Sequence, residues 1–408
     1  MDHVTRHTAQ QIISHFQGWI KSFSQRSAEL HTPADAADFE QRFRDEGLQM
    51  LGSMFQELLQ NALDHQDENR TCPKCGRRRR HKGRRERNLL SSVGAIRLSG
   101  TYWHCSDCGG QHAVDTLTPE SSSRPMQQLL CILGTSMASF AKASYAGKKL
   151  LGVRVSDATI RRLCYQHGRK VPIAPVPVEP KKDLVGSCDG TMVNTRQTGW
   201  RELKAYQFRY DSNRHGRAYL ESSKYFVPRL RQAAIALKAG DAGRIFWVSD
   251  AAEWIDKGVE KQLPMAVRII DIWHAWEHIH EASRAIYPDD EDKARCWAER
   301  YCEVLEDCGG YALHRRLRHN RYAQAKRQQA VDKLRNYLLK NASRMKYPEY
   351  KRKGYPISSG PMESFCKQLG QRLKGPGMRW DMGNITFMAN MVSLWANEEW
   401  DRHWKTVA

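Results

Sequence analysis

The hydrophobic positions of the first 70 residues repeat with helical spacing. Between Ala36 and Ala62 the apolar side chains recur every three or four residues, as on one face of a helix. Thr32 and Asp35, at the start of this stretch, are residue types that cap helices. We therefore predict a helical N-terminal region over residues 1–70. Its apolar face suits dimerisation or docking, and equally suits packing against its own domain.

A second helical pattern covers residues 119–171. It predicts an apolar helix over Met126–Lys149, a turn at Leu150–Val155, and a second helix over Asp157–Lys170. The second helix carries Arg161 and Arg162 and is capped by a serine. A capped basic helix after such a turn is typical of a helix-turn-helix that enters the major groove of DNA. An ordinary helical hairpin is the alternative.

Four prolines within residues 172–180 predict an extended linker over 172–182, before the pattern changes to strands. Residues 183–286 alternate short apolar, β-branched runs with helical segments. In order, we predict strands at Leu184–Cys188, Leu203–Tyr210 and Arg217–Phe226, a helix at Pro228–Ala239, a strand at Ile245–Ser249, a helix at Ala251–Leu263, a strand at Val267–Ile270, and a helix from His274. This is the element order of an RNase H-like α/β fold.

The rest of the chain reads as helical. Residues 287–350 predict a basic helical insertion in the RNase H-like core, and residues 351–408 predict the C-terminal part of that core. The fold class expected is therefore a multidomain α/β protein. A helical region, a cysteine-rich module over residues 71–118 and the helix-turn-helix precede its catalytic-type sheet domain.

The charge and composition of the chain indicate what kind of partner it binds. The chain has 408 residues and a formal net charge of +20, an excess that points to a polyanion such as nucleic acid. Residues 1–7 are polar and charged, without the apolar core of a signal peptide, and no apolar run reaches the length of a membrane span. We expect a cytoplasmic, nucleoid-associated protein without a membrane partner. Its 11 cysteines should be thiols or metal ligands.

Two matching CxxC pairs lie in residues 71–118. Cys72 and Cys75 form the first, Cys105 and Cys108 form the second, and a glycine follows each pair. Four thiolates suffice for a tetrahedral Zn²⁺ site, so we predict a zinc ribbon; a redox CxxC is the alternative, which the duplication disfavours. The basic run between the pairs includes four successive arginines: Arg77, Arg78, Arg79 and Arg80. These contact DNA phosphates or form a solvated loop.

Three acids have distinctive contexts. Asp189 and Asp250 follow short apolar runs, where buried strands end, and Glu363 lies just inside a predicted helix start after two serines and a proline. Carboxylates on three separate elements are suited to holding divalent ions for phosphoryl transfer. Taken singly, each is equally a solvated acid or a helix-dipole partner.

The sequences around these acids resemble an insertion-sequence transposase of the ISKra type, distantly similar to the Mutator-like DDE enzymes. The resemblance rests on residues 72–76, 188–193 with 200–204, 248–255 and 269–274, and most specifically on 355–364 followed by 372–380. It covers most of the chain from residue 36 onward. Asp271 also ends an apolar strand and is a further candidate for the site.

The resemblance implies an RNase H-like DNA transposase in which Asp189, Asp250 and Glu363 bind catalytic Mg²⁺ (or Mn²⁺). It further implies that the protein binds transposon terminal inverted repeats and target DNA, and that it acts as a homo-oligomer, a dimer or larger. Lys374 and Arg379 belong to a C-terminal basic block expected to follow the phosphate backbone. The alternative function is a non-catalytic zinc-ribbon and helix-turn-helix regulator derived from a transposase.

Overall fold

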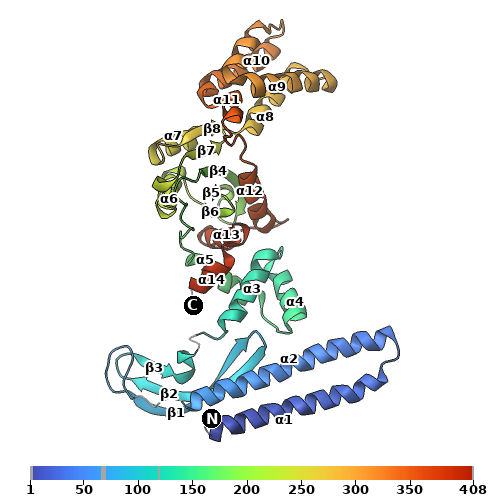
Figure 1. The fold of residues 1–408 in the computed structure, drawn as a ribbon, viewed down its shortest axis with the longest axis vertical. Helices are drawn as coiled ribbons and strands as arrows, with labels where there is room; N and C mark the ends of the chain where they lie inside the picture. The colour runs from blue at the N-terminus through green and yellow to red at the C-terminus, as the bar shows by residue number, and fades with distance from the viewer. Residues whose placement is uncertain (1–2, 66–69, 118–119, 407–408) are drawn as a thin grey trace. The chain divides into compact units, whose positions relative to one another are not determined.

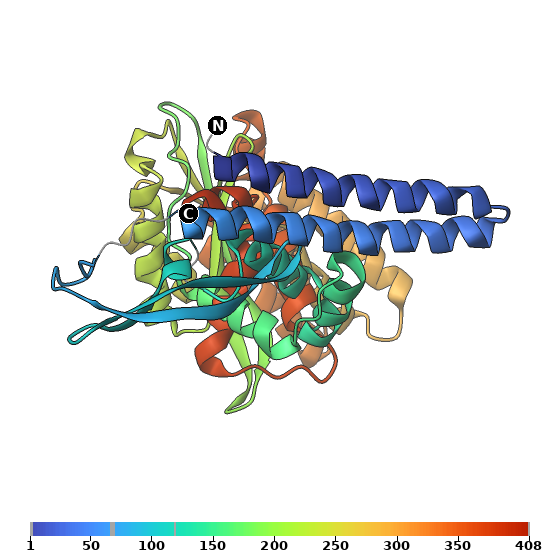
Figure 2. The ribbon, with the colours of Figure 1, turned by 90° about the horizontal axis from the view of Figure 1, so that it is seen from below.

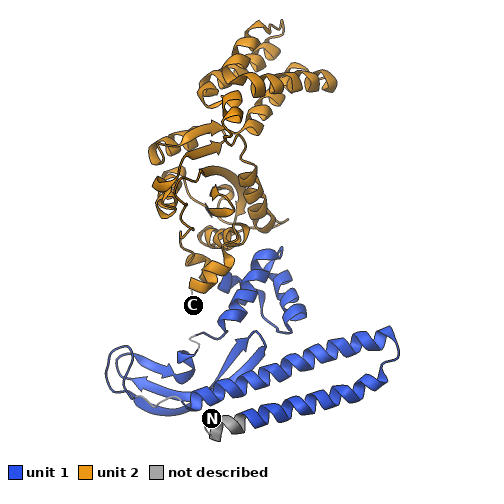
Figure 3. Cartoon of the chain, in the orientation of Figure 1, with its two compact units in different colours: residues 1–164, 408 blue, residues 165–407 orange. Residues whose placement is uncertain are grey.

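A computed structural model describes residues 3–65, 70–117 and 120–406. The chain forms two compact units, residues 1–164 and residues 165–407, which are coloured separately in Figure 3. Within the described ranges, no helix has the length and apolar character needed to cross a membrane.

The first unit begins with a long helical hairpin (Figures 1 and 2). Its helices are α1 (His3–Arg26) and α2 (Pro33–Asp64). Thr32 caps α2: its side chain accepts from the Asp35 amide, and the Asp35 carboxylate accepts from the Thr32 amide. This reciprocal arrangement satisfies two amides that the helix leaves unpaired, and it confirms the predicted helix and its cap.

A three-stranded antiparallel sheet follows, formed by β1 (Arg80–Ser91), β2 (Gly94–Cys105) and β3 (Gly109–His112) in that order. The C-terminal half of α2 packs on it around a small apolar core: Leu63, Leu89, Ile96, Leu98 and Val114. Residues 80–85 of the basic run between the two CxxC pairs lie on β1 and do not form a loop. Strand pairing with β2 holds these basic side chains at fixed positions.

Helices α3 (Arg124–Ser136), α4 (Phe140–Leu151) and α5 (Asp157–Arg169) come next. The single helix predicted over Met126–Lys149 is wrong, because the backbone is extended at Met137 and the Ser139 side chain caps a new helix by accepting from Lys142. The predicted turn is confirmed: Gly152, at φ 67°, ends α4 in the left-handed conformation that glycine adopts without strain.

The second unit is built on a five-stranded sheet of order β6-β5-β4-β7-β8. The strands are β4 (Leu184–Thr195), β5 (Gly199–Tyr210), β6 (Asn213–Tyr219), β7 (Ile245–Ser249) and β8 (Val267–Ile270). Strands β4, β5 and β6 pair antiparallel, whereas β7 and β8 add parallel to β4. The predicted order of strands and helices is confirmed.

Several predicted boundaries in this unit are wrong. Strand β4 runs to Thr195, because it pairs with β5 over its whole length, so Asp189 lies within a strand and not at its end. Strand β6 ends at Tyr219, and the residues after it join the next helix, which begins at Ser223 and contains Pro228. Antiparallel pairing extends β4 beyond its first apolar residues, and the helix from Ser223 contains a proline that we had expected at its start. The boundaries therefore differ from those that the local sequence indicates.

Helices cover both faces of the sheet. They are α6 (Ser223–Ala236), α7 (Glu253–Gln262), α8 (Ile272–Ile286), α9 (Glu291–Arg316), α10 (Ala325–Asn341), α11 (Tyr347–Arg352), α12 (Gly360–Leu373), α13 (Met382–Ala396) and α14 (Trp400–Thr406). Alternate residues of β7 serve two cores, as strand geometry requires. Ile245 and Trp247 pack with α6 and α7, while Phe246 and Val248 pack with α8 to α11.

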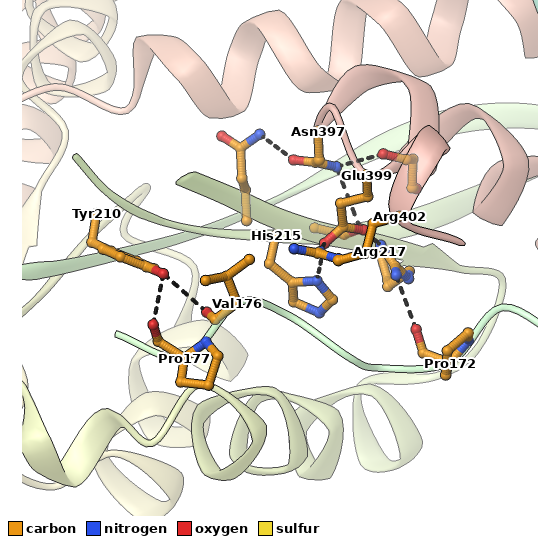
Figure 4. Close-up of polar contacts among 12 residues, drawn as sticks. Pro172, Val176, Pro177, Tyr210, His215, Arg217, Asn397, Glu399 and Arg402 are labelled. Carbon is orange, nitrogen blue, oxygen red and sulfur yellow. Dashed lines mark hydrogen bonds and ion pairs between the residues drawn. The ribbon is translucent and has the colours of Figure 1, made fainter. Parts of the chain in front are cut away.

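The edge strand β6 carries a buried polar cluster (Figure 4). The Glu399 carboxylate accepts hydrogen bonds from the guanidinium groups of Arg217 and Arg402. The Nδ1 atom of the buried His215 lies 2.7 Å from Glu399 Oε1. Arg217 also donates to the Pro172 carbonyl at 2.9 Å. These bonds fix the proline-rich segment and the C-terminal helix against the sheet.

Candidate functional sites

The four predicted zinc ligands meet at one point of the first unit. The Sγ atoms of Cys72, Cys75, Cys105 and Cys108 all lie within 4.8 Å of one another. Gly76 and Gly109 follow the two pairs with φ near 73° and 79°, the left-handed conformation that lets the backbone turn directly after each second cysteine. Soft thiolates at this spacing are the ligand set that Zn²⁺ prefers.

The electrostatics of the cysteine cluster also suit a cation. A hydrogen bond from the Lys74 backbone lowers the pKa of Cys72 to about 6, whereas a hydrogen bond with Cys75 raises the pKa of Cys108 to about 12. Without a cation, the Cys108 thiol therefore resists losing its proton beside the other cysteines. A divalent ion at the centre would allow all four sulfurs to be thiolates.

The arginines beside this cluster differ in their surroundings. Arg77 is ion-paired with Asp107 of the second CxxC pair at 2.6 Å, and Arg79 lies over the Trp103 ring and donates to Gln111. Arg78 and Arg80 are exposed. With Arg70, His81 and Trp103, the three arginines from 78 to 80 line a hollow of about 580 Å³. This cationic hollow suits a phosphate group.

The remaining predicted DNA contacts are on the surface. Arg161 and Arg162 are exposed on α5, whose buried face is formed by Ile160, Leu163 and Cys164. Lys374 and Arg379 are exposed between α12 and α13. The segment that carries them is attached to the β4–β5 hairpin, because the Trp380 amide donates to the Asn194 carbonyl at 2.9 Å.

The three predicted acids come from three elements of the second unit. Asp189 is a half-buried residue of the central strand β4, Asp250 directly follows β7, and Glu363 is exposed in the first turn of α12. The neighbouring parallel strands β4 and β7 bring the two aspartates into electrostatic contact. Burial, with the charge of Asp250 adding to it, raises the pKa of Asp189.

One histidine, His274, interacts electrostatically with all three acids, Asp189, Asp250 and Glu363. It is in the first turn of α8. Burial lowers the pKa of this imidazole, but Asp271, Glu277 and Asp250 outweigh burial and raise it above its ordinary value. Sequence reasoning gave His274 no role. Its position three residues after the acid that ends β8 was the available signal.

The carboxylates of the three acids do not form a closed ligand set. Glu363 is ion-paired with Lys367 one helical turn away, at 2.8 Å, and this cation lowers its pKa. Across the described part of the chain, the four cysteines are the single group of three or more candidate ligands whose atoms lie together. Cys366, one turn from Glu363, instead hydrogen-bonds Asp189, a contact that sequence reasoning missed.

Asp271 has a different arrangement from the three acids. It is buried, and its Oδ1 accepts from the Trp273 amide at 2.7 Å, which caps α8. Its Oδ2 accepts from both the amide (2.6 Å) and the hydroxyl of Ser359, the residue that precedes α12. Because both oxygens are engaged, Asp271 joins the start of α8 to the start of the helix that carries Glu363.

Comparisons with known proteins give little further information. No family model matches the chain, and no curated protein matches it. Among solved structures it is similar to the Drosophila P element transposase strand transfer complex, at 8% identity over 70% of this chain and 80% of that chain, with a TM-score of 0.26. It is also similar to the crystal structure of NurA, at 13% identity over 66% and 64%, with a TM-score of 0.13.

Proposed function

We propose that this protein is a DNA transposase of the DDE type, with an RNase H-like catalytic domain, that cuts transposon ends and joins them to target DNA. The observation that carries the proposal is the placement of Asp189 on β4 and of Asp250 directly after β7, the parallel strand that pairs with β4. Both aspartates, and Glu363 in the first turn of α12, also interact electrostatically with His274. The mixed sheet with the central Asp189 strand supports the same domain type.

The chemistry follows from the charges. Burial raises the pKa of Asp189, and the charge of the neighbouring Asp250 adds to this effect, so a divalent cation between the two carboxylates would favour their ionised forms. Mg²⁺ or Mn²⁺ held by the three acids would supply that charge, activate the attacking oxygen and stabilise the leaving oxygen. In the first step water forms a bond to phosphorus and the 3′ oxygen leaves. In the second step this 3′ oxygen attacks a target phosphodiester and displaces another 3′ oxygen.

Glu363 must release Lys367 to join the aspartates. The ion pair is exposed, and an exposed pair of this kind is worth little free energy, so a divalent ion or DNA phosphate can displace the lysine. Asp271 would act on this step indirectly, since it fixes the residue before α12.

DNA would be bound by several basic segments. We assign the zinc ribbon and helices α4 and α5 to recognition of the terminal repeats, with Arg78, Arg80, Arg161 and Arg162 as the exposed contacts. Lys374 and Arg379 would follow the phosphate backbone near the acids. Joining two ends requires two active sites, so we further propose a homo-oligomer of at least two copies.

One observation favours a second candidate, a DNA-binding regulator without catalysis. The three carboxylates do not meet, and Glu363 is neutralised by Lys367. In that case the zinc ribbon and the helix-turn-helix would still bind DNA, but strand cleavage would be absent with any divalent ion.

A cleavage assay separates the two candidates. The substrate is a plasmid carrying the DNA that flanks this gene, incubated with the full chain and Mg²⁺ or Mn²⁺. We expect strand cleavage that falls at least about 1,000-fold in Asp189→Asn, Asp250→Asn and Glu363→Gln, because several kcal/mol of transition-state stabilisation depend on the ions. DNA binding should be retained.

Glu253→Gln is the matched control. Glu253 is also an exposed glutamate in the first turn of a helix, ion-paired with the lysine four residues later at 2.6 Å, but on α7. Its substitution should leave cleavage unchanged. Binding without cleavage in the unsubstituted protein would favour the regulator.

A further inference from the structure

A cavity lies at the end of the five-stranded sheet that is away from Asp250. It forms where β4 and β7 begin and β5 ends, and its volume is about 610 Å³. Val185, on its lining, comes four residues before Asp189 on β4, which is roughly 13 Å along the strand. The cavity is therefore separate from the acidic site. Its other lining residues are 181–183, 209–211, Gly243 and Arg244.

Backbone contacts form one wall of this cavity. The Lys181 amide donates to the Asp241 carbonyl at 3.0 Å, and the Gly243 amide donates to the Lys182 carbonyl at 2.8 Å. A Cβ atom at position 243 would meet the Lys181 carbonyl oxygen at 2.4 Å, so this close approach requires glycine. Lys181 itself has φ 67°, a left-handed conformation that is uncommon for a residue with a Cβ atom. The fold thus places a lysine on the cavity through an unfavourable backbone conformation.

The charges on the cavity lining do not balance. Four of the lining residues are cationic and two are acidic, which leaves a net charge of 4 − 2 = +2. Both acids are already paired. Asp183 accepts a hydrogen bond from Arg244 Nε at 3.0 Å, and the Asp211 carboxylate lies 3.2 Å from Lys182 Nζ. The excess positive charge therefore comes from the other two cations.

These two cations are Arg209 and Lys181. Among the residues that the structure describes, neither side chain has an ion pair or a hydrogen bond. Arg209 is half-buried and lies directly opposite Arg214 in the pairing of β5 with β6, and like charges in such positions repel. Burial lowers the pKa of Arg209, and the charge of Arg214 lowers it further. An anion in the cavity would offset both effects.

We propose that this cavity binds a phosphate group, with Arg209 and Lys181 as its cationic contacts. A guanidinium can donate two parallel hydrogen bonds to a phosphate, and an ammonium adds a point charge. A phosphate monoester, or a pair of successive DNA phosphodiesters, carries about the two negative charges that balance the lining. A carboxylate would balance only half. Because the volume is in the range of small-molecule sites, the phosphate belongs to a larger ligand, either DNA or a small phosphate ester.

Hydrogen exchange of the zinc-loaded full chain, measured by mass spectrometry, tests the site. Inorganic phosphate in place of chloride, at constant ionic strength, should slow exchange in residues 181–185 and 209–213. Arg209→Gln should raise the phosphate concentration that gives half of this effect at least about tenfold, because a charged contact is lost.

Arg214→Gln is the matched control. It removes the same charge from the opposite position in the sheet, but Arg214 does not line the cavity and already has Glu398 at 3.6 Å. It should change the half-effect concentration less than about threefold, since only a screened long-range charge is lost.

A second measurement separates binding from a structural role of Arg209. Without phosphate, Arg209→Gln should leave the unfolding temperature of the second unit unchanged or raise it, because the substitution removes a repulsion between like charges. A structural arginine would instead lower that temperature when replaced. Lys181→Gln keeps the test decisive if Arg209→Gln does not fold, since it removes the exposed cation and should also weaken the phosphate effect.

A random-sequence DNA duplex distinguishes the two sources of the phosphate. If DNA supplies it, Arg209→Gln should reduce the salt dependence of duplex binding by about one phosphate contact, and Arg214→Gln should not. If a small ester supplies it, the salt dependence should stay unchanged while the phosphate effect weakens. Equal phosphate responses in Arg209→Gln and the unsubstituted protein would overturn the proposal, as would an equal response to acetate. None of these measurements involves strand cleavage, so their outcome is independent of the proposed transposase activity.

Discussion

The cysteine cluster and the acidic site differ in how the fold brings them together. Each CxxC pair lies on a few adjacent residues, and the two pairs are joined by one antiparallel hairpin, so all four sulfurs lie within 4.8 Å of one another. The three acids come from β4, from the end of β7 and from α12. All three interact electrostatically with His274, but their carboxylates do not form one group of metal ligands.

This difference shows what short sequence spacing can determine. Local backbone turns fix the cysteines once the hairpin forms, whereas the acids depend on the docking of a helix that follows a long helical insertion. We therefore expect the geometry of the cysteine centre to form together with its hairpin. The acidic site should require a ligand to draw Glu363 from Lys367.

The largest expected effect is loss of the metal from the cysteine centre. Cys72→Ser, or a strong chelator, should unfold residues 70–117 and lower zinc affinity more than about 100-fold, because small zinc modules lack a sufficient core without the ion. Limited proteolysis and metal analysis check this. Cys296→Ser, which replaces an exposed cysteine of α9, should change neither. A module that stays folded without zinc would contradict the prediction.

The second prediction concerns the acidic site. Asp271→Ala should reduce the free energy of unfolding of the second unit by about 2–4 kcal/mol, because buried donors at Ser359 and Trp273 lose a charged acceptor. Cleavage should fall further than stability explains, since Glu363 loses its positioning. Asp290→Ala removes the cap of α9 in the same way but on an exposed surface, and should have a much smaller effect. Equal effects of the two variants would show that Asp271 is only a cap.

The third prediction uses pH to separate the units. His215 has a pKa below its ordinary 6.5, first because of burial, and Arg217 and His215 hold the pKa of Glu399 below 4.5 despite its burial. A depressed folded-state pKa contributes stability that is present above the unfolded value and lost as pH falls. Stability of the second unit should thus decline below about pH 6.5 and again below about pH 4.5.

Denaturant unfolding at a series of pH values, followed by probes in each unit, measures this decline. Glu399→Gln should remove the decline in stability below about pH 4.5 while leaving the stability of the first unit unchanged. A chelator that removes zinc should instead destabilise the first unit and leave the stability of the second unit unchanged. A second unit equally stable from neutral to acidic pH would contradict the assignment of this cluster.

The smallest effect distinguishes arginines beside the cysteine centre. Arg80→Ala should reduce the salt dependence of DNA binding by about one phosphate contact. Arg77→Ala should change it less, because Arg77 is already paired with Asp107. Binding titrations at several salt concentrations compare the two. Equal changes in slope would mean that the Arg77 ion pair opens on DNA.

The sequence predicted local features better than distant ones. The cysteine ligands, the cap at Thr32 and the turn at Gly152 follow from a few adjacent residues, and the element order of the second unit follows from alternating patterns. The full length of β4 was missed because its second half is stabilised by pairing with β5 and not by its own apolar character. The interaction of His274 with the three acids depends on how α8 packs, so the sequence signals it only weakly, through its position three residues after Asp271. The roles of the three acids remain a prediction.

The contact between Asp271 and Ser359 has a consequence for reading related chains. These residues are 88 positions apart, and the Ile272 amide also donates to the Ile357 carbonyl, so the segment between them leaves the sheet and returns at one point. Loop-closure entropy rises only with the logarithm of length, about 0.6 kcal/mol for each doubling. Flexible residues added within the excursion would therefore cost little free energy, provided that α8 to α11 keep the core that they share with Phe246 and Val248. The number of residues between Asp250 and Glu363 is then a poor indicator that two chains are related. A better indicator is an aspartate directly after a strand, as Asp271 is, that pairs with a serine before the helix of the third acid.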